Sequence, residues 1–152
     1  VFSAFNTKNA EKNSEIISPQ KSPKNIYDDN KTYGGIANDS RFIILGDLNA
    51  SNFDGDAIDS GIGALLTDPL IQDPAPKSSG GAAHTNDNKN AKHHTAFWRM
   101  RADYVLPSVK GWKIEDSGIF WPNKDDATYQ LIKDRNASSD HRLVWVDLTL
   151  TN

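Results

Sequence analysis

The chain has 152 residues, with 20 acidic against 17 basic side chains, and it contains no cysteine. A chain of this length can form one domain with a sizeable core, and the lack of cysteine excludes a disulfide scaffold, an iron–sulfur site and a cysteine nucleophile. The net charge of −3 argues against a general DNA-coating role, which needs excess Lys and Arg, and no apolar run reaches the ~20 residues that cross a bilayer.

Residues 1–40 are expected to form a polar N-terminal segment. The stretch NAEKNSEII predicts a short helix over 9–17, which Pro19 ends. A polar loop follows over 24–40. From Arg41 onward the chain is richer in apolar runs, so residues 41–152 are predicted to form the folded lobe.

The first elements of this lobe alternate in type. The apolar run at 42–45 predicts a strand buried on both faces. Apolar residues at helical spacing predict a helix over 58–66. Residues 73–94 show no periodicity and are expected to form a long connection, of a length that is often functional.

Three further strands are expected in the second half of the lobe, over 101–106, 112–121 and 142–150. Between the last two, the sequence DDATYQLIKD predicts a helix over 125–134, with acidic residues at its start. The resulting order of strands and helices predicts a layered α/β protein.

Of the 20 acidic residues, 17 are Asp, which indicates either a loop-rich protein or one that uses a few Asp side chains chemically. Three polar groups lie at the ends of predicted strands. The first is GDLNA, where Asp47 and Asn49 point to the same side of the strand. The alternative is that this pair forms a turn or caps the next helix.

The other two groups also allow two interpretations. Asp103 lies among apolar residues, where a carboxylate is costly unless it is paired, and an ion pair with Arg101 or Arg99 would supply that pairing. Asp140 and His141 precede the last strand, and they need a turn or bulge to face one site. The alternative for this last pair is a solvated loop.

Other side chains are interpreted structurally. Tyr104 is expected in the core, because it faces away from the preceding residue. His84, His93 and His94 are expected to be solvated loop residues, with substrate or metal contact as the alternative. The tryptophans are expected to pack on the sheet, although Trp98 could stack on a base.

Together, the GDLN, RADYVL and SDH motifs resemble in order and spacing the C-terminal motifs of the endonuclease/exonuclease/phosphatase superfamily. All three are intact over residues 42–148. The phrases YVLPS, SGIFWP and SSDHRLVWVDL look closest to predicted bacterial exported phosphoesterases, which implies an exported location. The resemblance implies an α/β (α+β) fold, the C-terminal half of a DNase I-like four-layer α/β/β/α sandwich with mostly antiparallel or mixed sheets and flanking helices.

The resemblance also implies metal-dependent hydrolysis of phosphate esters. Asp47 would orient or deprotonate the attacking water, and Asn49 would hold a phosphate oxygen. His141 would bind or protonate the phosphoryl group, with Asp103 fixing its tautomer and charge. A non-enzymatic binding module on the same scaffold is the alternative function.

The implied metal ligands are Asp140, directly or through water, and Asp47, and such oxygen ligands suit Mg²⁺ or Mn²⁺ better than zinc. Arg101 is a candidate phosphate-binding residue. The expected substrates are nucleic acids, inositol phosphates or phospholipid headgroups. The motifs bind only phosphate and metal, which all three substrate classes share, so they do not distinguish among them.

The superfamily's N-terminal half supplies an Asn, a metal-binding Glu and a catalytic His that are not recognisable here. Glu11 and Glu15 lie in a polar stretch, and no His precedes His84. The missing half is therefore expected upstream of Val1 as a partner of this lobe, and the lobe alone is expected to be inactive or nearly so.

Overall fold

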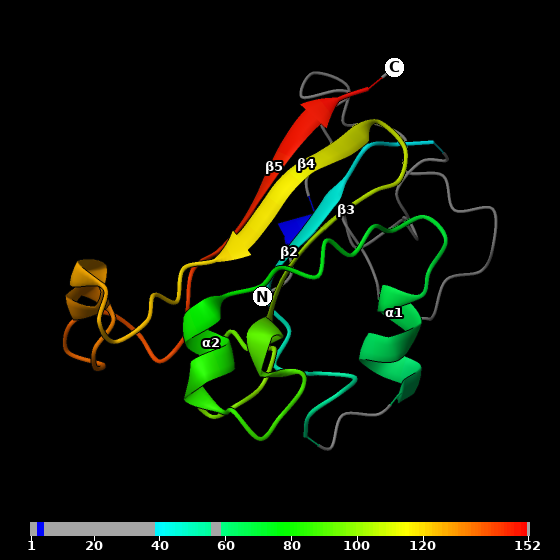
Figure 1. Cartoon of the computed structure of the whole chain (residues 1–152). Helices are drawn as coiled ribbons and strands as arrows, with labels where there is room; N and C mark the ends of the chain where they lie inside the picture. The colour runs from blue at the N-terminus through cyan, green and yellow to red at the C-terminus, as the bar shows by residue number, and fades with distance from the viewer. Residues whose placement is uncertain (1–2, 5–38, 56–58, 152) are drawn as a thin grey trace.

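A computed structural model describes residues 3–4, 39–55 and 59–151 of the chain (Figure 1). The helix predicted over 9–17 lies outside the described residues, as does most of the polar loop predicted over 24–40. The described part consists of helices and antiparallel strands in two small sheets, in agreement with the expected α/β fold.

The first sheet has three antiparallel strands in the order β1 (Ser3–Ala4), β2 (Ile43–Asp47) and β3 (Asp103–Pro107). The apolar run predicted as a strand forms β2, but the prediction that it is buried on both faces is wrong. Residues 43–46 are each only partly buried. Ile44 packs against a core cluster, and neither core cluster of the described residues includes Ile43 or Leu45.

The core under this sheet is formed by Ile62, Tyr104 and Leu106. The helix predicted over 58–66 appears as a π-helical turn, η1 (Asp59–Gly63), that continues into α1 (Ala64–Leu66). Tyr104 is only 1% exposed, which confirms the expectation that it faces the core. Each large apolar side chain buried here contributes about 1.5–3 kcal/mol relative to its exposed state.

The second sheet pairs β4 (Trp112–Ile119) with β5 (Val144–Leu150). Side chains along β5 alternate between partly buried and exposed, as the sequence pattern predicts. Gly118 lies opposite Trp145, and a Cβ at Gly118 would be 2.6 Å from the indole ring, so the strands approach this closely only with glycine there. In Figure 1 the β4–β5 pair stands beside β2 and β3, and β3 contacts β5.

The connection over 73–94 is not structureless, which corrects the prediction. It contains α2 (Ser79–His84) and a 3₁₀ turn, η2 (Ala91–His93). Ser78 caps α2, because its side-chain oxygen accepts a hydrogen bond from the Gly81 N–H at 3.1 Å. A helix of six residues with two glycines is too short to show an apolar period, so the pattern could not reveal it.

The helix predicted over 125–134 is also shorter than expected. It is a 3₁₀ helix, η3 (Ala127–Leu131), and Asp126 caps its start by accepting from the Thr128 N–H at 2.8 Å. Ile132 follows it and packs with Ile119 and Trp121 in a second core cluster.

Candidate active site

The pairing of β2 with β3 brings the first two polar groups together. In this register Asp47 lies directly opposite Asp103. Two like charges at opposed positions of an antiparallel pair repel each other, so a cation or a proton donor is needed between them. The imidazole of His141 takes this place, with Nδ1 2.9 Å from Asp103 Oδ2 and Nε2 4.0 Å from Asp47 Oδ2.

These three residues form what we call the Asp–Asp–His cluster (Asp47, Asp103 and His141). One ligand atom of each lies within 4.8 Å of the others. The three sequence motifs therefore meet at one point, although they are separated by dozens of residues along the chain.

A turn before β5 orients His141. The Ser139 hydroxyl accepts a hydrogen bond from the His141 N–H at 3.0 Å, which gives the turn that the adjacent Asp140 and His141 required. Ala96 forms an isolated β-bridge with His141. The Trp98 ring packs edge-on against the imidazole, with 4.8 Å between ring centroids. The imidazole is thus held by the preceding turn and by the neighbouring segment.

Asp103 is fixed by Thr95, a residue that the sequence analysis missed. The buried Thr95 hydroxyl donates to Asp103 Oδ2 at 2.7 Å. The same hydroxyl oxygen accepts from the backbone N–H groups of Ala102 and Asp103, at 2.9 and 3.0 Å. The spacing of Thr95 and Asp103 along the chain gives no signal of this contact, because it depends on the loop between them folding back.

The electrostatics of the cluster favour a charged imidazole. Partial burial acts to lower the pKa of His141, but its hydrogen bond with Asp103 and the charges of Asp103, Asp47 and Asp140 outweigh burial and raise the pKa above its ordinary value. Since Asp103 engages Nδ1, the proton on Nε2 faces Asp47 and the open side of the cluster. This arrangement can present a proton to an anion.

Asn49 and Asp140 lie beside the cluster rather than in it. Asn49 has a left-handed backbone with φ of 46°, and its N–H donates to Asp47 Oδ1 at 2.8 Å. Asp47 therefore forms the turn that the alternative interpretation proposed, and it also joins the cluster. The Asp140 carboxylate makes an ion pair with Arg135 at 2.7 Å.

The structure does not bring Arg101 into the cluster. Its side chain is only 2% exposed, and its two terminal nitrogens donate to the two carboxylate oxygens of Asp73 at 2.7 and 2.6 Å. The guanidinium also lies over the Tyr104 ring, 4.3 Å from its centroid. The partner of Arg101 is thus Asp73 and not Asp103, and the pair holds the 73–77 connection to the core.

The expectation of solvated loop histidines is wrong. His94 is fully buried, with Nε2 3.1 Å from Asp54 Oδ2. His93 and His84 are partly buried, and each has a ring nitrogen in hydrogen-bonding contact with a backbone carbonyl, of Pro76 and Phe97 respectively. The reason is that the connection folds into α2 and η2, which pack these rings inward.

The donor set of the Asp–Asp–His cluster fits a divalent cation. Carboxylate oxygens are the ligands that Mg²⁺ and Mn²⁺ prefer, whereas the charged imidazole would have to lose a proton before it could bind the same ion. The Asp47 side chain is 48% exposed, so one side of the cluster stays open to water or to an incoming phosphate.

Helices and antiparallel strands in small sheets are consistent with an α/β protein of the DNase I-like type. A family model described as the Endonuclease/Exonuclease/phosphatase family matches residues 9–141, most of the chain, and the chain therefore belongs to that family. Membership implies phosphoester hydrolysis in general, and the family is typically metal-dependent.

No curated protein and no solved structure matches the chain. The matched range begins at residue 9 and so includes much of the N-terminal segment. Among the residues that the structure describes, no helix is both long and apolar enough to cross a membrane.

Proposed function

We propose that the protein hydrolyses phosphate esters with the help of a divalent cation, Mg²⁺ or Mn²⁺, at the Asp–Asp–His cluster. The observation that carries the proposal is the meeting of two opposed strand-end carboxylates with one imidazole. The convergence of these residues favours a catalytic role over a non-enzymatic module, which would not require them to meet at one point.

The proposed roles follow from the contacts. Asp103, held by Thr95, keeps Nδ1 of His141 engaged, so Nε2 can bind or protonate a phosphoryl oxygen. Asp47 orients or deprotonates the attacking water from its exposed side. Asn49, which follows Asp47 in the same turn, holds a phosphate oxygen.

The cation would be held by Asp47, and its bound charge would neutralise negative charge on the phosphoryl oxygens. Asp140 is proposed as the second ligand, and its carboxylate has to leave Arg135 to reach the same ion. The buried Arg101 is not proposed as a phosphate ligand, because Asp73 occupies its terminal nitrogens.

The test is hydrolysis of bis(p-nitrophenyl) phosphate and p-nitrophenyl phosphate by the full-length protein, with Mg²⁺, with Mn²⁺ and with EDTA. Asp47→Asn and His141→Gln are each expected to lower kcat/KM by about 100-fold or more, the usual contribution of an acid–base group. EDTA is expected to abolish turnover.

Asp116→Asn is the matched control, because Asp116 is an exposed carboxylate on β4 outside the cluster. It should leave the rate unchanged. If Asp47→Asn and His141→Gln both keep the activity of the parent protein, the proposal is wrong.

A further inference from the structure

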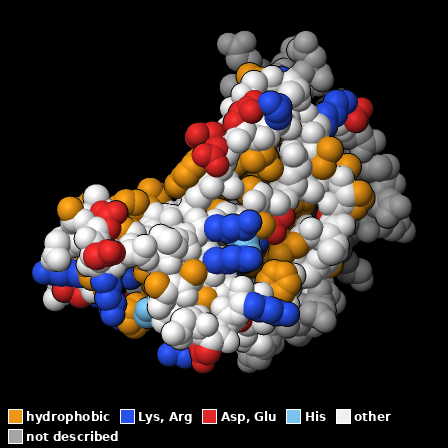
Figure 2. Space-filling view, in the orientation of Figure 1, with side chains coloured by type: hydrophobic (Ala, Val, Ile, Leu, Met, Phe, Trp, Pro, Cys, Tyr) orange, Lys and Arg blue, Asp and Glu red, His pale blue; other side chains and the backbone are white. Residues whose placement is uncertain are grey.

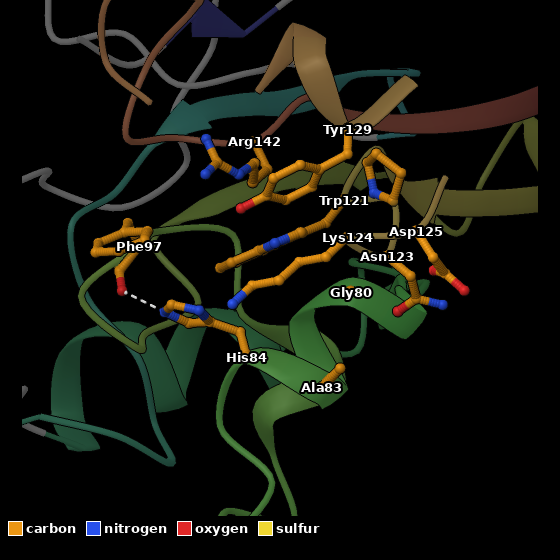
Figure 3. Close-up of a pocket in the computed structure, with 11 residues that line it drawn as sticks. Gly80, Ala83, His84, Phe97, Trp121, Asn123, Lys124, Asp125, Tyr129 and Arg142 are labelled. Carbon is orange, nitrogen blue, oxygen red and sulfur yellow. Dashed lines mark hydrogen bonds between the residues drawn. The ribbon is translucent and has the colours of Figure 1, made fainter. Parts of the chain in front are cut away.

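Two neighbouring pockets share the side chains of Phe97 and Arg142. The first, which we call the aromatic pocket, has a volume of about 450 Å³ and lies between α2 and the segment that leads from β4 to η3, with His84 and Trp121 in its walls (Figure 3). The second, which we call the loop pocket, has a volume of about 350 Å³. Its lining residues come from 97–98 and 133–142, which are the two segments that hold His141.

The loop pocket adjoins the imidazole of the Asp–Asp–His cluster. Trp98 lines this pocket, and its ring packs edge-on against that of His141, with 4.8 Å between the centroids. Ser139 also lines it, and its hydroxyl accepts the N–H of His141 at 3.0 Å. Asp140, a third lining residue, directly precedes His141 in the chain. A group bound in the loop pocket therefore lies next to the turn that presents the imidazole.

The charges around the loop pocket favour an anion. Three basic side chains line it, those of Lys133, Arg135 and Arg142, against the two carboxylates of Asp134 and Asp140. Such an excess of positive charge beside His141 suits the oxygens of a phosphoryl group.

The two arginines of this pocket differ in their freedom to bind a ligand. Arg142 is only 7% exposed and lies over the Trp121 ring, 4.8 Å from its centroid (Figure 3). One of its terminal nitrogens donates to the backbone carbonyls of Ser139 and His141. Its guanidinium is thus part of the packing that supports the turn.

Arg135, by contrast, has an exposed side chain and a partner that can be exchanged. The side chain is 80% exposed, and Nη2 lies 2.7 Å from Oδ2 of Asp140 in an ion pair. An ion pair with so exposed a member is weak, because water screens the charges and both side chains lose freedom. An incoming anion can therefore replace the Asp140 carboxylate at the guanidinium.

The backbone around Arg135 is held while its side chain stays exposed. The Asp134 carboxylate accepts the backbone N–H groups of Asn136 and Ala137, each at 2.9 Å. The Ser138 N–H donates to the Asp134 carbonyl at 3.3 Å. Arg135 lies inside this hydrogen-bonded turn, so a change of partner needs a rotation of its side chain only.

We propose that Arg135 is a phosphate-binding residue of the candidate active site, and that Asp140 holds its guanidinium beside the loop pocket until a phosphoryl oxygen replaces the carboxylate. This inference rests on the proposed function, which places the phosphate at the Asp–Asp–His cluster. A guanidinium has five N–H donors in a planar fork that matches phosphate oxygens. The exchange also releases the Asp140 carboxylate for the cation. Arg135 thereby takes the role that the sequence predicted for Arg101.

The test titrates the full-length protein with inorganic phosphate in EDTA, by phosphorus NMR and by calorimetry. Arg135→Gln is expected to weaken phosphate binding about fivefold, the upper range for an exposed ion pair, and Arg135→Lys should keep most of the affinity. Lys113→Gln is the matched control, because Lys113 is 63% exposed, is paired with Glu115 at 2.8 Å and lies outside both pockets. It should leave phosphate binding unchanged.

Asp140→Asn gives the sharper result, because its expected effect has the opposite sign. Without the competing carboxylate, phosphate should bind about two- to fivefold more tightly in EDTA. The same substitution in the Arg135→Gln background should give no such gain. Asp116→Asn removes one negative charge from β4, outside the loop pocket, and measures the effect of net charge alone.

Unchanged phosphate binding in Arg135→Gln would overturn the inference, as would weaker binding in Asp140→Asn or a gain that persists without Arg135. A parent protein that binds no phosphate would overturn it as well. The titration involves neither cation nor turnover, so it is independent of the hydrolysis assay. Normal hydrolysis by Asp47→Asn and His141→Gln would refute the proposed function, while the role of Arg135 is decided by phosphate binding.

Discussion

Asp103, the first residue of β3, accepts a hydrogen bond from Thr95, which lies in the segment before that strand. Thr95 satisfies two backbone N–H groups and the carboxylate with one hydroxyl. Because the side chain of Thr95 is fully buried, water cannot replace it. The position of the Asp103 carboxylate is therefore tied to local stability.

Removing this hydroxyl is expected to destabilise the fold. Thr95→Val keeps the side-chain volume but leaves two N–H groups without their acceptor, which should lower the free energy of unfolding by about 1–3 kcal/mol. Urea denaturation followed by circular dichroism measures this change.

Thr95→Ser is the control, because it keeps the hydroxyl and loses one methyl group, at a cost of about 1 kcal/mol. If the serine variant is destabilised as much as the valine variant, the hydroxyl does not have the role given to it here.

At the scale of elements, α2 forms one wall of the aromatic pocket because a glycine lets it approach the chain at Trp121. The Gly80 N–H donates to the Trp121 carbonyl at 3.0 Å. A Cβ at Gly80 would lie 2.2 Å from the Trp121 carbonyl oxygen and 2.5 Å from that of Pro122. Both obstacles are backbone atoms, so they cannot move aside as a side chain would.

Gly80→Ala is therefore expected to push α2 away from this segment. The clash should cost about 1–3 kcal/mol, although alanine favours helix over glycine by up to about 1 kcal/mol. A lowered Tm in thermal unfolding is the expected result.

The same substitution at Gly61 tests the argument, because a Cβ there would meet no atom within 4 Å. Gly61→Ala should leave Tm unchanged or raise it. Equal losses at both positions would mean that the close approach at Gly80 does not limit stability.

At the scale of the whole molecule, acidic and basic side chains nearly balance, 20 against 17. Figure 2 shows acidic and basic side chains interspersed with apolar ones over the visible face, as the net charge of −3 suggests.

Two histidines give stability opposite pH dependences. Burial lowers the pKa of His94 despite the nearby Asp54, whereas the neighbouring carboxylates raise that of His141.

The direction of each effect on stability depends on whether the folded or the unfolded chain binds the proton more tightly. The unfolded chain protonates His94 near a pKa of about 6.5, but the folded chain resists this until lower pH, so His94 removes stability as pH falls below about 6.5. Its charged surroundings include His84 and His93, which also disfavour its protonation. His141 is protonated more readily in the folded state, so its contribution is present at low pH and is lost as pH rises through its raised pKa.

Urea unfolding between pH 7.5 and 5.5 should reveal both effects. The loss of stability toward pH 5.5 is expected to be smaller in His94→Gln than in the parent protein and larger in His141→Gln. Equal slopes in all three proteins would contradict these pKa shifts.

The sequence alone was sufficient to locate strands β2, β3 and β5 to within about two residues and to identify the polar groups near their ends. The apolar run before Asp47, the core position of Tyr104 and the alternation along β5 are local patterns, and the structure confirms them. The family also follows from the sequence, since the three motifs keep its order and spacing. Neighbours along the chain are enough to define such features.

The tertiary structure decided what those residues contact. The pairing of Arg101 with Asp73, the burial of His94 and the support from Thr95 each join positions that no local period relates. Likewise, strand pairing set Asp47 opposite Asp103, and the folded connection forms one side of the pocket lined by His84 and Trp121. A sequence pattern reports which face a side chain takes, but charge partners and cavities depend on which distant segments pack against that face.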